Sequence, residues 1–75
     1  MFLYLPVEHE AELPGLGWRR TFGLRVLWSG EAGDEEVMIL PHVSTDFGFT
    51  LRLASLLTRE QADPFRLLDG LEGWL

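Results

Sequence analysis

The chain has 75 residues, a formal net charge of −6, and neither cysteine nor lysine. The missing cysteine excludes disulfides, thiolate metal sites and thiol redox chemistry. The missing lysine excludes Schiff-base catalysis and P-loop phosphate binding. A chain of this length is expected to form one domain, residues 1–75, with a small core that often needs self-association as a supplement.

The first residues predict neither a signal peptide nor a membrane span. The apolar run 1–7 has no basic residue before it and is far shorter than the ~20 residues that cross a bilayer. The acidic balance also argues against generic binding to phosphate backbones, which requires an excess of basic residues. We therefore expect a soluble, cytoplasmic protein without membrane contact.

Period-2 alternation of apolar residues predicts a sheet. Residues 18–28 are the clearest strand. One face carries mainly apolar side chains and the other carries mainly arginine, threonine and glycine, with Arg20 and Leu27 as exceptions. The apolar set is Trp18, Phe22, Leu24, Val26 and Trp28.

Three further runs favour strands. Residues 47–53 alternate as cleanly as 18–28, residues 36–43 alternate less cleanly, and residues 2–7 form a short candidate. Pro6 and Pro41 lack an N–H, which predicts edge positions or strand ends. The glycine-containing segment 29–34 and the polar segment 44–46 predict connecting turns, and 9–17 is expected to be a loop with one short turn.

The C-terminal third favours helix. Thr58 and Gln61 have the spacing of a capping box, and Asp63 followed by Pro64 is a second helix start. Apolar residues after Phe65 fit one helical face. The predicted fold class is α+β: a four-stranded (three to four) antiparallel meander sheet with one C-terminal helix packed on one face, in two layers.

Two local groups have residue types that could carry chemistry. Glu8, His9, Glu10 and Glu12 could hold a divalent cation, but an extended segment would turn the imidazole away from the glutamates, and a solvated acidic loop is the favoured interpretation. His42 and Asp46 flank Ser44 and Thr45, which gives the residue types of a catalytic triad. These residues are common in turns for local reasons. We therefore predict no enzyme activity, no cofactor and no metal, with metal binding at 8–12 left open.

Arg19, Arg25 and Arg52 are expected on the sheet face opposite the aromatic residues. Such a face could bind an anion or an acidic partner, or could bind RNA, although RNA readers also need exposed aromatics. Salt pairing with the many carboxylates is the favoured interpretation of these arginines.

The apolar content exceeds what a core of this size needs, which predicts an interface. The residues assigned to it are Leu27, Met38 and Leu40, expected on the solvated sheet face, and Leu71, Trp74 and Leu75 near the C-terminus. The predicted function is a small non-enzymatic interaction or regulatory module that forms a homodimer or docks on a larger protein. The alternative is a nucleic-acid-related protein, either an RNA binder or an acidic mimic, and this alternative is less favoured.

Overall fold

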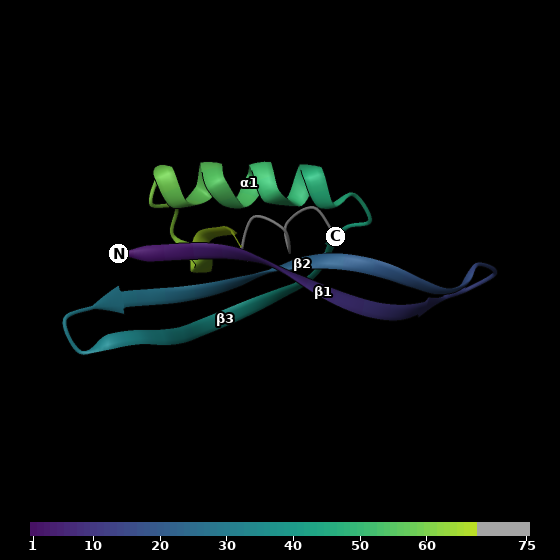
Figure 1. The fold of residues 1–75 in the computed structure, drawn as a ribbon, viewed down its shortest axis with the longest axis horizontal. Coiled ribbons are helices and arrows are strands. Elements are labelled where there is room, and N and C mark those ends of the chain that lie inside the picture. Colours follow the sequence, from purple (N-terminus) through teal and green to yellow (C-terminus); the bar gives the residue numbers. More distant parts are fainter. Residues whose placement is uncertain (68–75) are drawn as a thin grey trace.

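The computed structural model describes residues 1–67, and it consists of a three-stranded sheet with one helix on one face. The strands are β1 (Phe2–Leu13), β2 (Gly17–Gly30) and β3 (Gly33–Ser44), followed by α1 (Phe47–Arg59). Both strand pairs are antiparallel and follow chain order, so the sheet is a meander (Figure 1). The expected α+β meander with a following helix is confirmed, with three strands in the described residues.

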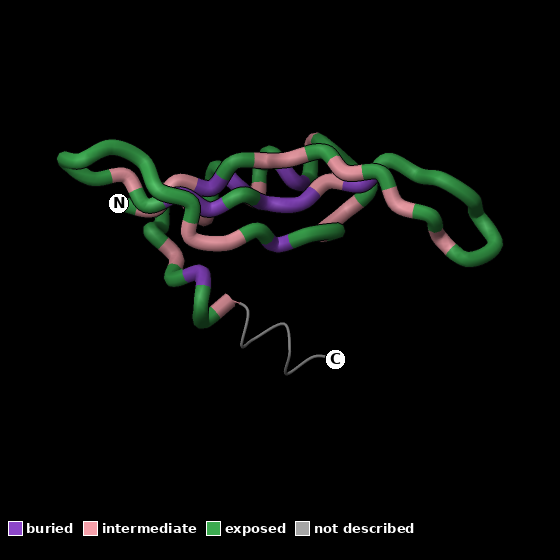
Figure 2. Tube along the Cα trace, turned by 90° about the horizontal axis from the view of Figure 1, so that it is seen from below, coloured by how far each residue is buried: buried purple, intermediate pink, exposed green. Residues whose placement is uncertain are grey.

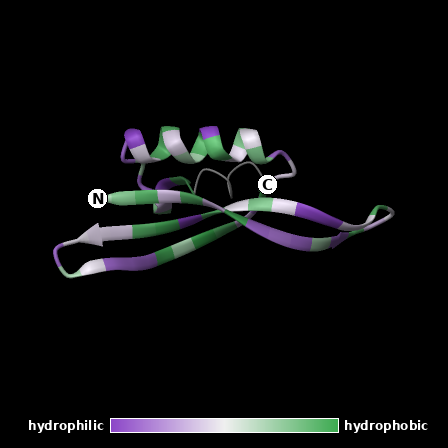
Figure 3. Cartoon of the chain, viewed as in Figure 1, coloured by the Kyte–Doolittle hydropathy of each residue, from purple (hydrophilic) through white to green (hydrophobic). Residues whose placement is uncertain are grey.

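β1 is longer than expected. Residues 9–13, predicted as loop, continue the strand and pair with 17–21 of β2. The loop shrinks to a tight turn, in which the N–H of Leu16 donates to the carbonyl of Leu13 and Gly15 adopts a φ of 77° that favours glycine. The paired residues 9–21 form a hairpin arm that extends beyond β3 (Figure 1) and is largely hydrophilic (Figure 3).

Residues 47–53 are helical, so the strand predicted there is wrong. The carboxylate of Asp46 accepts a hydrogen bond from the N–H of Phe49 and caps the helix. The alternation over 47–53 coincides with a longer helical pattern, in which the residues at i, i+3, i+4 and i+7 face the sheet. These residues are Thr50, Leu53, Ala54 and Leu57.

The capping box expected at Thr58 and Gln61 is also wrong, because these residues lie at the end of α1 and just after it instead of starting a helix. Their side chains bind the edge of β1. The N–H of Phe2 donates to Gln61 Oε1 at 2.8 Å, and the N–H of Tyr4 donates to Thr58 Oγ1 at 2.9 Å. Phe2 and Tyr4 thus direct their N–H groups away from β2, and Pro6 takes the next alternate position, where no partner strand needs an N–H. This confirms the edge position predicted for Pro6.

The core lies between the sheet and α1. It is built from Tyr4, Leu24, Val26, Leu40 and Ala54, with Met38 and others packed against it (Figure 2, purple). The expectation that Met38 and Leu40 face solvent is therefore wrong. Both faces of β3 carry apolar residues, so its alternation alone does not reveal which face a helix will cover.

β3 is irregular where it meets the middle of β2. Leu24 pairs with Leu40 and Phe22 pairs with Ser44, so three residues of β3 span the single residue Gly23. A Cβ on Gly23 would lie only 2.3 Å from the carbonyl oxygen of Leu40. The irregularity contains Pro41 on an edge strand, as predicted, and His42 with a φ of 55°.

Asp63 and Pro64 start a helical segment, as predicted. The N–H of Phe65 donates to Asp63 Oδ1 at 2.9 Å, and residues 64–67 are helical. The interface residues predicted further on, Leu71, Trp74 and Leu75, lie outside the described residues. Within residues 1–67, no helix is long and apolar enough to cross a membrane.

Candidate interaction surface

The sheet has an open face, on the side away from α1. Because successive side chains of a strand alternate between faces, the neighbours of the core residues point to this side. The cross-strand pairs Leu3–Leu27, Leu5–Arg25 and Arg25–Ile39 place them together. We define the open face as Leu3, Leu5, Val7, Arg25, Leu27, Glu36 and Ile39.

Large apolar side chains are exposed on this face. Leu5 is 42% exposed and Ile39 is 44% exposed. Leu27 lies on this face as predicted, but it is only 8% exposed because it stands on the central strand between flanking side chains. The exposed apolar residues of this face that sequence reasoning missed are thus Leu5 and Ile39, whose outward direction depends on where the helix packs.

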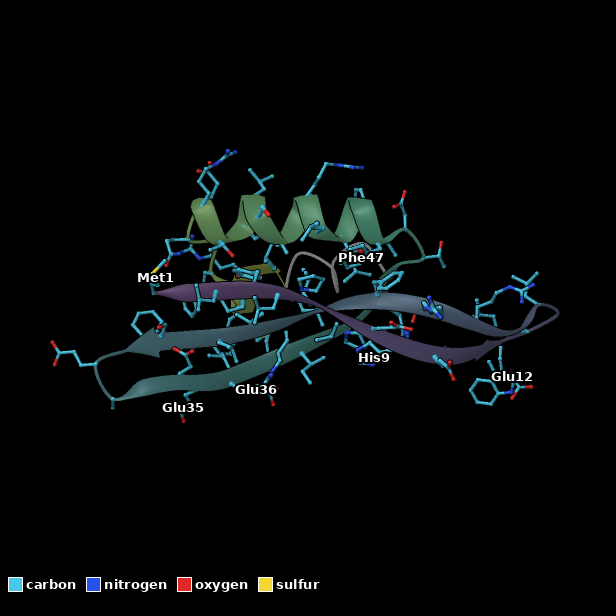
Figure 4. The ribbon with its side chains drawn as sticks, viewed as in Figure 1. Met1, His9, Glu12, Glu35, Glu36 and Phe47 are labelled. Atoms are coloured by element: carbon cyan, nitrogen blue, oxygen red, sulfur yellow. The ribbon has the colours of Figure 1, made fainter. Side chains whose placement is uncertain are left out.

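The charges of the open face are paired. Arg25 Nε lies 2.8 Å from Glu36 Oε1, across β2 and β3, and Figure 4 shows Glu36 on the side away from α1. Of the three arginines for which salt pairing was favoured, Arg25 forms such a pair, whereas Arg19 donates to the carbonyl of Trp18 at 3.2 Å. Arg52 lies on α1, so the expectation that Arg19, Arg25 and Arg52 share one sheet face is wrong.

A groove of about 450 Å³ lies between the edge of β1 and α1. Leu3, Leu5 and Pro6 line it from the strand, and Leu51 and Ser55 line it from the helix. Leu5 therefore belongs to both the groove and the open face, and the apolar surface continues around the edge of the sheet.

The glutamates of the predicted acidic loop share one face of β1 and leave His9 on the other. Glu8 forms an ion pair with Arg20 at 2.7 Å. His9 is labelled on the side of the sheet away from α1 in Figure 4. The separation expected for an extended segment is confirmed, and within residues 1–67 no three metal-ligating side chains group together.

The residues considered for a catalytic triad have structural contacts instead. Asp46 caps α1, and Ser44 Oγ accepts a hydrogen bond from the N–H of Asp46. His42 Nδ1 lies 2.9 Å from Thr21 Oγ1, on the neighbouring strand. His42 and Asp46 are therefore engaged with different partners.

No family model, curated protein or solved structure matches this chain. Any inference about the function of this chain therefore rests on its described surface.

Proposed function

We propose that this chain is a small non-enzymatic protein-interaction module that forms a homodimer through the open face of its sheet. The observation that carries the proposal is the exposure of Leu5 and Ile39 on the sheet face opposite α1. Leu5 and Ile39 lie on either side of Arg25, whose charge is balanced by Glu36, and exposed apolar side chains gathered on one face of a small domain usually mark a contact site. Covering it would supplement a core that has few fully buried side chains.

The charge of the open face supports a second copy as the partner. The whole chain carries −6, so most surfaces of two copies repel each other. On the open face the Glu36 carboxylate is already balanced by Arg25. Two such faces can therefore meet without placing unpaired like charges against each other.

The edge of β1 is less suited to pairing with a copy of itself. The N–H of Phe2 is already bonded to the side chain of Gln61, just after α1, and the N–H of Tyr4 is bonded to the side chain of Thr58, in the last turn of α1. Further along, Glu8, Glu10 and Glu12 would approach the same residues of an antiparallel copy, and like charges opposite each other destabilise strand pairs. Face-to-face packing of two sheets, about 10 Å apart, avoids both problems.

The proposal is tested by sedimentation velocity and light scattering over a wide range of chain concentration. The variant Ile39→Glu replaces an exposed apolar side chain of the open face with a charge, and Leu56→Glu places the same charge on α1 at nearly equal exposure (44% and 43%). We expect the wild type and Leu56→Glu to be dimers and Ile39→Glu to be a folded monomer. A monomeric wild type at millimolar concentration, or a dimer lost only in Leu56→Glu, would overturn the proposal.

A further inference from the structure

Two histidines that are 33 positions apart in the sequence lie side by side on the sheet. His9 belongs to β1 and pairs with Thr21 of β2, and His42 belongs to the irregular part of β3. The ring centroids of His9 and His42 are 5.7 Å apart, with an interplanar angle of 60°. Imidazole is the commonest side-chain ligand for zinc and similar ions.

His9 has an unsatisfied atom at this place. Its Nε2 is buried and has no hydrogen-bond partner within residues 1–67. Buried polar atoms are nearly always paired, and an exception often marks the position of a water or an ion. The cross-strand position of Thr21 and the neighbouring His42 ring make this a polar end of the open face.

Thr21 is placed to orient His42. Thr21 is buried, and its Oγ1 lies 2.9 Å from His42 Nδ1. When Nδ1 carries the proton and donates it to this hydroxyl, Nε2 holds a lone pair that can bind a metal. Metal-ligating histidines typically make such a hydrogen bond through their other ring nitrogen, because it fixes the tautomer and the ring direction.

The spacing of the rings also suits a shared ion. With Zn–N distances of about 2.0–2.1 Å and a tetrahedral angle, two imidazoles on one zinc have ring centroids roughly 5 Å apart. The observed 5.7 Å differs little from this value. His42 is exposed, so a small rotation of its ring could close the difference.

We propose that His9 and His42 bind one zinc ion per chain through their Nε2 atoms, with water in the remaining coordination positions. Residues 1–67 supply only two ligands, because they hold no cluster of three metal-ligating side chains. Affinity is therefore weaker than at closed structural zinc sites, which have four protein ligands. The site exchanges its ion and can accept a further ligand from a partner.

The test is a titration of the chain, free of any histidine tag, with Zn²⁺ by calorimetry and by NMR of the imidazole nitrogens. We expect one ion per chain and a shift of Nε2, not Nδ1, in both histidines. His9→Gln and His42→Gln are each expected to weaken binding about tenfold or more, and Thr21→Val to weaken it by a smaller factor. The matched control is Glu8→Gln, a neighbour on the opposite face of β1, which should bind as the wild type does.

Three results would overturn the site: no Nε2 shift at millimolar zinc, an unchanged affinity in both histidine variants, or an equal loss in Glu8→Gln. The NMR measurement on the wild type keeps the test valid if a variant does not fold. The inference does not depend on self-association, because Ile39→Glu leaves both histidines in place. That variant is expected to be monomeric and to keep the zinc affinity of the wild type.

Discussion

The hydroxyl of Tyr4 donates a 2.6 Å hydrogen bond to the carbonyl oxygen of Ala62, and this contact joins the first strand to the segment that follows the helix. Tyr4 is 3% exposed and belongs to the core, so the bond is shielded from competing water. The two residues are 58 positions apart, and their contact attaches the segment that follows α1 to the first strand of the sheet.

Replacing Tyr4 with phenylalanine should therefore lower the free energy of unfolding by about 1–2 kcal/mol. The ring and its packing remain, while the carbonyl of Ala62 loses its partner in a partly buried place. Urea unfolding followed by tryptophan fluorescence measures the change. An unchanged midpoint would mean that water replaces the hydroxyl without cost.

The same environment makes stability depend on alkaline pH. Burial raises the pKa of Tyr4 to about 12, and the charge of Asp63 contributes to the rise. The unfolded chain loses this proton near pH 10, so the folded state binds more protons between these values. The contribution of Tyr4 to the free energy of unfolding should therefore be present in full below pH 10 and be lost as the pH rises towards 12.

Tyr4 is the single tyrosine of the chain, so its phenolate absorbance reports the titration directly. The native protein should titrate about two pH units above the urea-unfolded protein, and Tyr4→Phe should have a smaller loss of stability over this range. Titration near pH 10 in the native state would contradict the burial of the hydroxyl.

Gly23→Ala should destabilise the sheet by about 2–3 kcal/mol, because the new methyl group would lie 2.3 Å from the backbone oxygen of Leu40. A backbone atom cannot move aside as a flexible side chain can. Gly30→Ala is the control, since its nearest contact is the Trp28 side chain at 3.4 Å. Thermal or urea unfolding should separate the two variants, and equal stability would show that the strands shift easily.

Gln61→Ala should weaken the attachment of β1 to α1 and cost about 1–2 kcal/mol. The side-chain amide accepts from the N–H of Phe2 and donates to the carbonyls of Phe2 and Thr58. Hydrogen exchange should show faster exchange at the N–H of Phe2 and Tyr4. Glu60→Ala, which removes only an exposed contact with Arg59, should stay within about 0.5 kcal/mol of the wild type.

Much of the sheet could be predicted from local patterns. The alternation of 18–28 predicted β2 and the separation of its two faces, and Pro6 and Pro41 predicted edge positions or strand ends. The start of the last helical segment followed from Asp63 and Pro64. Each of these features depends on the chemistry of a few neighbouring residues.

The local patterns were insufficient where two periods fit the same residues. Phe47, Phe49, Leu51 and Leu53 alternate as a strand would, but the cap at Asp46 and the helical face that continues to Leu57 prevail. Likewise, β1 extends to Leu13 because the arm of β2 offers it a partner. Ala11 and Leu13 alternate with Glu10 and Glu12 there, but so short an apolar pattern does not by itself predict a strand.

The sequence by itself determined that this is a small acidic domain, with a central strand of two distinct faces and more apolar residues than its core requires. Only the tertiary structure decided which face the helix covers, and therefore that Leu40 is buried while Ile39 is exposed. It also decided that His9 and His42 meet. Alternation defines two faces but not the burial of either one, and contacts between residues 33 apart depend on the register of three strands.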